Sequence, residues 1–189
     1  MLKVGDRMPF FEVMDQNGNK FNSLQLLGRK TIIYFYPKDN TSGCTAQACS
    51  LRDNYARLVA EGYNVIGISK DSVNSHKNFA SKYDLPFTLL SDTSTEILQA
   101  FGAWGEKKMY GKTTMGTLRK TFIFDEEGIL VKIIEKVDTK NHASQILDWV
   151  ISSCRTRSPS TRAARTVLSC GASSTMCRIR TVERSPRYP

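Results

Sequence analysis

Apolar residues in the first 150 positions recur at two spacings, one typical of β-strands and the other of α-helices. Every residue of Thr31–Tyr36 is β-branched or aromatic, as expected of a strand that is buried on both faces. After a turn-rich stretch, apolar residues recur every three or four positions, as they do on one face of a helix: Cys44, Ala48, Leu51, Tyr55, Leu58 and Val59. The pattern therefore predicts a central strand that leads directly into a helix.

The same two spacings predict further elements on either side of this unit. Strands are expected at Phe10–Met14, Lys20–Phe21, Asn64–Ser69, Phe87–Leu90, Lys120–Phe124 and Ile129–Val137, and helices at Val73–Tyr83, Thr93–Phe101 and His142–Ile151. Asn17-Gly18-Asn19 suits the turn of a hairpin, and Ser72 can cap the helix that follows it. This order of elements predicts an α/β fold with a mixed central sheet that helices flank on both faces.

Composition divides the chain into two parts. Of the 189 residues, 40% are hydrophobic and 24% are charged, which is ordinary for a globular protein. The net charge of +9 is unevenly spread, because residues 1–150 carry 19 basic and 17 acidic side chains, whereas residues 151–189 carry eight arginines and one acid. We therefore predict a folded domain at residues 1–151 and a disordered, basic, Ser- and Arg-rich tail at residues 152–189.

Two interpretations of the tail stay open. A read-through or a shifted reading frame would produce such a segment, and a basic tail could instead engage nucleic acid or another anionic partner. The second interpretation would show as salt-sensitive retention that disappears on truncation after Ile151. Because the domain is nearly neutral and the tail lacks interleaved aromatic residues, we expect no nucleic-acid partner.

The sequence gives no indication of a membrane location or of export. A membrane helix needs about 18–20 apolar residues, and the longest apolar stretch, Thr31–Tyr36, has only the length of a strand. The first residues, Met1–Asp6, lack the apolar core of a signal peptide. We expect a cytoplasmic protein with no membrane partner, in a compartment where thiols stay reduced.

The segment between the central strand and the helix carries the candidate chemistry. Cys44 lies in the expected first turn of the helix, where unpaired backbone N–H groups favour an anion and so stabilise a thiolate. Gly43 is expected to keep the sulfur accessible, and Thr41 places a hydroxyl nearby. A cysteine on the apolar face of a helix is more often a small buried hydrophobe. The polar, glycine-containing approach and a second cysteine, Cys49, favour a reactive thiol here.

The string FYPKDNTSGCTAQAC resembles the active-site segment of the peroxiredoxins, in particular the bacterioferritin comigratory protein (peroxiredoxin Q) subfamily. The Pro-x-x-x-Thr-x-x-Cys pattern of that family falls on Pro37, Thr41 and Cys44. Its distal arginine falls on Arg119, in the string LRKTFIFD. The resemblance covers residues 2–150, about four-fifths of the chain.

The resemblance implies a thioredoxin-like fold and a thiol peroxidase that reduces hydrogen peroxide and organic hydroperoxides. The Cys44 thiolate would attack the peroxide and become a sulfenic acid. Arg119 would stabilise the thiolate and polarise the peroxide, while Thr41 and backbone amides near Gly43 would hold the peroxide oxygens. The family usually has proline immediately before the Gly-Cys pair, where this chain has Ser42. We expect this difference to make the loop more flexible without abolishing the activity.

Cys49 is expected to resolve the sulfenic acid by forming an intramolecular disulfide. In a regular helix, residues five apart have Cα atoms about 8.5 Å from each other, whereas a disulfide requires about 7 Å or less. The helix must therefore unwind locally before Cys49 can reach Cys44. The alternative is a spectator thiol, since some members of the family manage with one active cysteine. The resemblance further implies recycling by thioredoxin or a similar dithiol reductant.

No cofactor is expected from the sequence. The Cys44-x4-Cys49 pair lacks the two further ligands of a zinc site, and His76 and His142 are isolated along the chain. The spacing also differs from the Cys-x2-Cys pair of a thiol–disulfide oxidoreductase, which is the leading alternative enzyme. We therefore expect a peroxidase that uses no metal, haem or flavin. We also expect a monomer, with the three tail cysteines incidental.

Overall fold

The computed structural model describes residues 2–109 and 112–156. The predicted tail lies outside the described residues from residue 157 onward. The division of the chain into residues 1–151 and 152–189 therefore stays a prediction.

The described strands and helices alternate through most of the chain. The strands are β1 (Glu12–Asp15), β2 (Lys20–Asn22), β3 (Lys30–Phe35), β4 (Tyr63–Ser69), β5 (Thr88–Ser91), β6 (Trp104–Met109), β7 (Lys112–Thr117), β8 (Lys120–Phe124) and β9 (Leu130–Ile134). The helices are the 3-10 turn η1 (Ser23–Leu26), α1 (Ser42–Asp53), α2 (Tyr55–Ala60), α3 (Val73–Lys82), α4 (Glu96–Ala100) and α5 (His142–Thr156). Ser72 caps α3 by accepting the backbone N–H of Ser75, as predicted.

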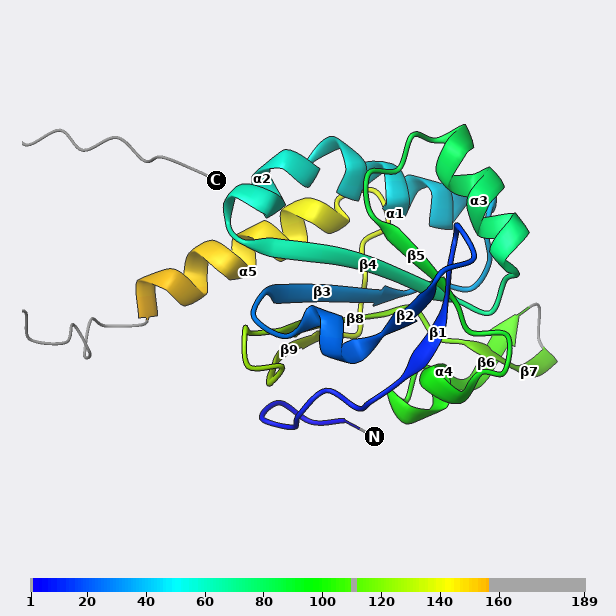
Figure 1. The fold of residues 1–189 in the computed structure, drawn as a ribbon, viewed down its shortest axis with the longest axis horizontal. Helices are drawn as coiled ribbons and strands as arrows, with labels where there is room; N and C mark the ends of the chain where they lie inside the picture. Colours follow the sequence, from blue (N-terminus) through cyan, green and yellow to red (C-terminus); the bar gives the residue numbers. More distant parts are fainter. Residues whose placement is uncertain (1, 110–111, 157–189) are drawn as a thin grey trace, which may run out of the picture. The chain divides into compact units, whose positions relative to one another are not determined.

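Seven strands form one mixed sheet in the order β2-β1-β5-β4-β3-β8-β9 (Figure 1). The central strands β3, β4 and β5 run parallel, while β8 pairs antiparallel with β3 and β1 pairs antiparallel with β5. Parallel neighbours need crossover connections, which α1 with α2 and then α3 provide. The predicted α/β class with a mixed central sheet is confirmed.

Side chains of β3 alternate between two hydrophobic cores, one on each face of the sheet. Ile32 and Tyr34 lie in a core that α1, α2, α3 and α5 cover, whereas Ile33 and Phe35 lie in a core that α4 covers. Figure 1 shows these helices on opposite sides of the sheet. All four side chains are almost completely buried. The prediction of a strand buried on both faces is therefore confirmed.

The helix that follows the central strand is interrupted, which the sequence pattern did not predict. α1 ends at Asp53, and Asn54 adopts φ −109° and ψ 9° before α2 begins at Tyr55. The side-chain amide of Asn54 donates a hydrogen bond to the carbonyl of Ser50 at 3.1 Å, a local bond that competes with continuation of the helix. Because the break changes the helical phase, Val59, which was expected on the buried face, is 48% exposed.

Two further differences from the sequence prediction lie later in the chain. β6 and β7 pair antiparallel as a separate two-stranded sheet. Their lysine, threonine and glycine residues give them no clear apolar alternation, so the sequence pattern did not reveal them. α5 begins at His142 as predicted, but it continues past Ile151 to Thr156.

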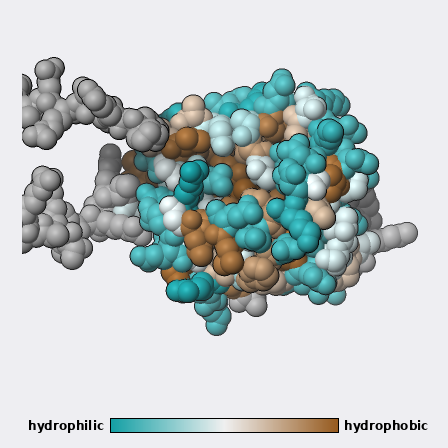
Figure 2. Space-filling model, viewed as in Figure 1, coloured by the Kyte–Doolittle hydropathy of each residue, from teal (hydrophilic) through white to brown (hydrophobic). Residues whose placement is uncertain are grey.

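Hydrophilic side chains make up much of the described surface that Figure 2 draws. On the face drawn in Figure 2, hydrophobic side chains lie in separate patches among hydrophilic ones. The exposed large apolar residues include Val4, Phe10 and Leu24, and scattered exposure of this kind is usual. Within the part of the chain that the structure describes, no helix has both the length and the apolar character needed to cross a bilayer.

Candidate active site

Cys44 lies in the first turn of α1, after the loop that leaves β3. Thr41 is the N-cap residue, with φ −89° and ψ 148°, and its carbonyl accepts the backbone N–H of Thr45 at 2.8 Å. Among the described residues no side chain caps α1, and its first turn contains no acidic residue. The N-terminal N–H groups are thus available to an anion. The prediction that Cys44 lies at a helix N-terminus is confirmed.

The sulfur of Cys44 is covered in this structure. The residue is 1% exposed and belongs to the core beneath α1, so the expectation that Gly43 keeps the sulfur accessible is wrong for this state. Cys44 packs in that core, and the guanidinium of Arg119 contacts its sulfur. A Cβ atom on Gly43 would lie 3.4 Å from Nη2 of Arg119, which is an ordinary contact, so the position of the cation does not itself require glycine.

Strand pairing brings Arg119 to the sulfur. Arg119 comes immediately before β8, and the antiparallel register of β8 with β3 places Lys120 opposite Phe35. Since β3 ends at Phe35, the start of β8 lies at the sheet edge from which the loop to Cys44 departs. Nη2 of Arg119 donates to Sγ of Cys44 at 3.4 Å. The structure thus brings together two of the residues that the sequence singled out.

A buried chain of polar side chains continues behind Arg119. Nη1 of Arg119 donates to Oε1 of Gln47, and Nε2 of Gln47 lies 3.2 Å from Nδ1 of His142. Nε2 of His142 lies 3.0 Å from Oγ1 of Thr121. The sequence indicated neither Gln47 nor Thr121, and His142 was expected to be isolated. The available signal was the position of Gln47 three residues after Cys44, which puts both on one side of a helix.

His142 is uncharged at neutral pH. Burial, and after it the positive charge of Arg119, lower the pKa of His142 from 6.5 to about 3, against an opposing effect of Asp138. The neutral imidazole has one ring nitrogen that donates and one that accepts. It can therefore bond to a donor on one side and to an acceptor on the other.

The loop before α1 is anchored by the buried carboxylate of Asp39. This carboxylate accepts from the hydroxyls of Tyr36 at 2.8 Å and Ser75 at 2.6 Å, and it lies 2.9 Å from Nδ1 of His76. Burial alone would raise the pKa of Asp39, but His76, Ser75 and Tyr36 together outweigh burial and lower it. The backbone N–H of Asp39 donates to the Asp71 carboxylate at 2.8 Å. Contacts with the start of α3 thus fix the loop.

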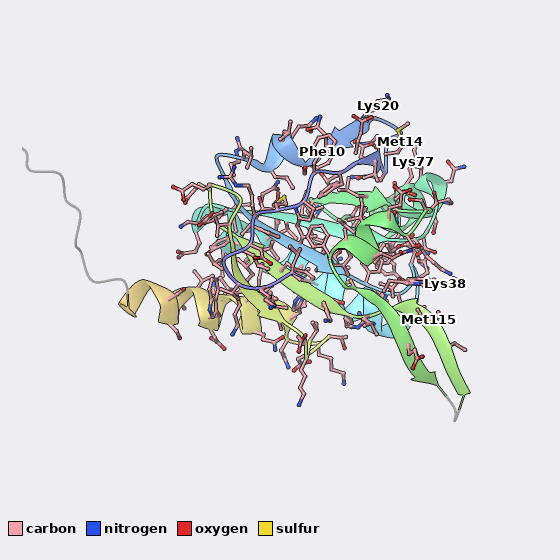
Figure 3. All side chains as sticks on the ribbon, turned by 90° about the horizontal axis from the view of Figure 1, so that it is seen from below. Phe10, Met14, Lys20, Lys38, Lys77 and Met115 are labelled. Carbon is pink, nitrogen blue, oxygen red and sulfur yellow. The ribbon has the colours of Figure 1, made fainter. Side chains whose placement is uncertain are left out.

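Thr41 and Pro37 belong to this same loop. Oγ1 of Thr41 donates to the carbonyl of Lys38 at 3.1 Å. Thr41 is exposed, and Pro37 is half-buried. Figure 3 shows Lys38 and Met115, which lies on β7, on the same side of the domain. The contact of the Thr41 hydroxyl with a bound peroxide stays a prediction, since here the hydroxyl bonds to the backbone.

Two comparisons with known sequences agree with this geometry. A model of the AhpC/TSA family matches residues 4–133. Peroxiredoxin Bcp of Escherichia coli (strain K12) is 42% identical over 149 residues, which cover 79% of this chain and 96% of that protein. The chain is a peroxiredoxin of the AhpC/TSA family. It is therefore an oxidoreductase of the peroxidase type, as the sequence resemblance implied.

Solved structures of other peroxiredoxins resemble this one in fold. The bacterioferritin comigratory protein of Xanthomonas campestris aligns with a TM-score of 0.71 and 33% identity, over 76% of this chain and 91% of that one. Peroxidoxin BcpB of Mycobacterium tuberculosis aligns with a TM-score of 0.71 and 29% identity, over 80% of this chain and 98% of that one. These likenesses confirm the thioredoxin-like fold and the resemblance to the bacterioferritin comigratory protein subfamily.

Cys49 of this peroxiredoxin lies on the same helix as Cys44. α1 is continuous from Ser42 to Asp53, and both cysteines are free thiols, with Cys44 buried and Cys49 partly buried. A regular helix holds residues at this spacing too far apart for a disulfide. The role of Cys49 as the resolving thiol stays a prediction that requires the helix to open.

The two histidines near the peroxiredoxin site are hydrogen-bonded to other side chains of the protein. His76 bonds to Asp39, and His142 lies between Gln47 and Thr121. Within residues 2–109 and 112–156, no three His, Cys, Asp or Glu side chains are grouped so that they could hold a metal ion.

Proposed function

We propose that this peroxiredoxin reduces hydrogen peroxide and organic hydroperoxides with Cys44 as the nucleophile. The observation that carries the proposal is the contact between Nη2 of Arg119 and Sγ of Cys44, 3.4 Å long, at the N-terminus of α1. A cation and the unpaired N–H groups of a helix both favour the thiolate, which is the reactive form of cysteine. A cysteine that only fills space in a core needs neither a nearby cation nor unpaired N–H groups of a helix.

The first step oxidises the sulfur. The Cys44 thiolate attacks the terminal oxygen of the hydroperoxide, an S–O bond forms and the O–O bond breaks. The departing oxygen takes a proton and leaves as water or as an alcohol, while Cys44 becomes a sulfenic acid. Arg119 and the backbone N–H groups near Gly43 stabilise the negative charge that develops on the departing oxygen, and Thr41 holds the peroxide.

The second step closes a disulfide. The thiol of Cys49 attacks the sulfenic sulfur of Cys44, releases water and forms an S–S bond. This step needs the first turns of α1 to unwind, since the intact helix separates the two residues. Ser42, where the family usually has proline, places one constraint fewer on that opening.

The third step returns the enzyme to its dithiol form. One thiol of thioredoxin or a similar dithiol reductant attacks the Cys44–Cys49 disulfide and forms a mixed disulfide with the enzyme. The second thiol of the reductant then releases the enzyme with both thiols reduced, and the reductant becomes a disulfide. We assign this cycle to the cytoplasm, because the free thiols of Cys44 and Cys49 suit a reducing compartment. We assign it to a monomer, because the side chains that it uses all belong to one chain. Residues 1–151 hold all the side chains that the proposed cycle uses.

A coupled assay with thioredoxin, its reductase and NADPH tests this function. Hydrogen peroxide and an organic hydroperoxide should each drive NADPH oxidation at a rate proportional to the peroxiredoxin. The solved relative from Xanthomonas campestris is described as having alkyl peroxide reduction activity, which supports including the organic substrate. Absence of turnover with both peroxides and with every dithiol donor tried would contradict the proposal.

A further inference from the structure

Four side chains beside the sulfur form a chain of hydrogen bonds, which we call the circuit because it starts beside β8 and ends on β8. The circuit starts at Arg119 before β8, passes through Gln47 on α1 and His142 at the start of α5, and returns to β8 at Thr121. Gln47, His142 and Thr121 have no exposed surface. Because water does not reach them, each polar atom depends on its partner in the circuit for a hydrogen bond.

The direction of each bond follows from the donors and acceptors present. A guanidinium only donates, so Gln47 must present Oε1 to Arg119 and its NH2 group to His142. Nδ1 of His142 must then accept, which leaves the ring proton on Nε2, from which it is donated to Oγ1 of Thr121. One neutral tautomer of the imidazole satisfies all the bonds at once.

We propose that His142, as its neutral Nε2–H tautomer, is a positioning residue that fixes the amide of Gln47 and thereby holds the guanidinium of Arg119 against Cys44. This role rests on the function proposed above for Cys44 and Arg119. Without the Nδ1 acceptor, the Gln47 amide is free to rotate and to turn its NH2 group toward Arg119. Two donors would then face each other, and Arg119 would leave the sulfur.

A second proton on the ring would have the same effect as loss of the acceptor. Both ring nitrogens would donate, and Nδ1–H would face the NH2 group of Gln47. The charged groups near the ring are Arg119, whose charge opposes this protonation, and Asp138, whose charge favours it. The ring of Tyr34 packs edge-on at 6.2 Å between centroids and contributes no charge in its phenol form. Burial prevails, and the circuit stays intact at neutral pH.

The circuit explains why a polar group is kept in this part of the core. A histidine that only filled space would need no acceptor at Nδ1, and an apolar side chain would pack there at lower cost. His142 instead connects α5 to β8 and α1 through specific atoms. Its effect on Cys44 is therefore expected to depend on the δ1 acceptor and not on the volume of the side chain.

Two isosteric substitutions separate these roles. His142→Leu removes the acceptor, whereas His142→Asn keeps an oxygen at the δ1 position that can accept from Gln47. Two quantities are measured on the full chain: the second-order rate constant of Cys44 oxidation by hydrogen peroxide, and the pH midpoint of iodoacetamide alkylation of the Cys44 peptide, followed by mass spectrometry. Arg119→Met and the wild type are measured in parallel.

We expect Cys44 of the His142→Leu variant to be oxidised about tenfold more slowly than Cys44 of the wild type. We also expect the pH midpoint of its alkylation to rise, as it should in Arg119→Met. We expect His142→Asn to stay within about threefold of the wild-type rate. Wild-type behaviour of His142→Leu beside an impaired Arg119→Met would overturn the role of His142 and leave the proposed function standing. Equal impairment of the Leu and Asn variants would also overturn it. If the wild type itself did not react, the proposed function would fail instead.

Thr121 provides a second pair of variants if His142→Leu does not fold. Thr121→Val removes the acceptor that holds the ring proton on Nε2, so the ring can shift its proton to Nδ1 and face Gln47 with a donor. Thr121→Ser keeps the hydroxyl. Slower oxidation in Thr121→Val, restored in Thr121→Ser, supports the circuit, and equal rates in both variants overturn it.

Discussion

Nη2 of Arg119 lies 3.4 Å from Sγ of Cys44, although 75 positions separate the two residues along the chain. The contact depends on the antiparallel pairing of β8 with β3, which brings the start of one strand to the end of the other. The reactive centre is therefore built from two distant segments by the register of the sheet.

Arg119→Met should slow oxidation of Cys44 by hydrogen peroxide about 100-fold, because the variant loses both the charge beside the thiolate and a donor to the peroxide. Arg119→Lys should recover only part of the rate, since an ammonium cannot donate to the sulfur and to Gln47 in the same fork geometry. Stopped-flow oxidation gives these rates. Lys38→Met, which removes an exposed cation from the loop before α1, is the matched control and should react normally. An unchanged rate in Arg119→Met would contradict the assigned role.

Thr41→Val should slow the same oxidation step about tenfold, whereas Thr41→Ser should stay close to the wild type, because the peroxide needs the hydroxyl and not the methyl group. In the resting loop that hydroxyl donates to the carbonyl of Lys38. Circular dichroism establishes that α1 is retained in each variant. Equal rates for the Val and Ser variants would show that the hydroxyl of Thr41 does not contact the peroxide.

Cys49→Ser should consume one equivalent of peroxide and stop at the sulfenic acid, because no second thiol closes the disulfide. Mass spectrometry of peptides from the peroxide-treated wild type should find Cys44 joined to Cys49, and amide exchange should increase across residues 41–53 as α1 opens. Normal cycling of Cys49→Ser with thioredoxin would assign Cys49 as a spectator, as would pairing of Cys44 with a tail cysteine.

The position of Cys44 could be predicted from the sequence because it depends on local features. A β-branched strand, a polar turn and an apolar repeat together place a cysteine in the first turn of a helix, and the structure agrees. Arg119 has no such local signal, and only the resemblance to a family indicated it. The helix breaks at Asn54, whose side-chain amide donates to the carbonyl of Ser50, and an apolar repeat gives no indication of such a bond.

The rest of the site could not be predicted because it depends on tertiary packing. Gln47, His142 and Thr121 lie on α1, α5 and β8, and they meet only when β8 pairs with β3 and α5 packs beside α1. His142 was described as isolated along the chain, yet in the fold it has polar partners on both ring nitrogens. The expectation of an accessible Cys44 was wrong for the same reason, because Cys44 packs in the core and a distant arginine contacts its sulfur.

The stability of the domain should fall as the pH is lowered from about 6.5. His142 is neutral in the folded state, with a pKa of about 3 against 6.5 for a free imidazole. Between these values the unfolded chain binds a proton that the folded chain does not, so the free energy of unfolding falls by up to about 1.4 kcal/mol per pH unit.

Urea unfolding between pH 6.5 and pH 4.5 measures this slope. His142→Asn, which has no titrating ring, is the matched control and should lose most of the slope. A wild type and a variant with the same pH dependence would show that His142 is not buried as a neutral group.

Trapping of the oxidised sulfur tests the central claim most directly. The wild-type chain and Cys44→Ser are each treated with one equivalent of hydrogen peroxide in the presence of dimedone, and their peptides are analysed by mass spectrometry. We predict that dimedone marks Cys44 in the wild type or that Cys44 is found in a disulfide, and that Cys44→Ser neither consumes peroxide at a comparable rate nor turns over with a dithiol. Wild-type peroxide consumption by a folded Cys44→Ser variant would contradict the account.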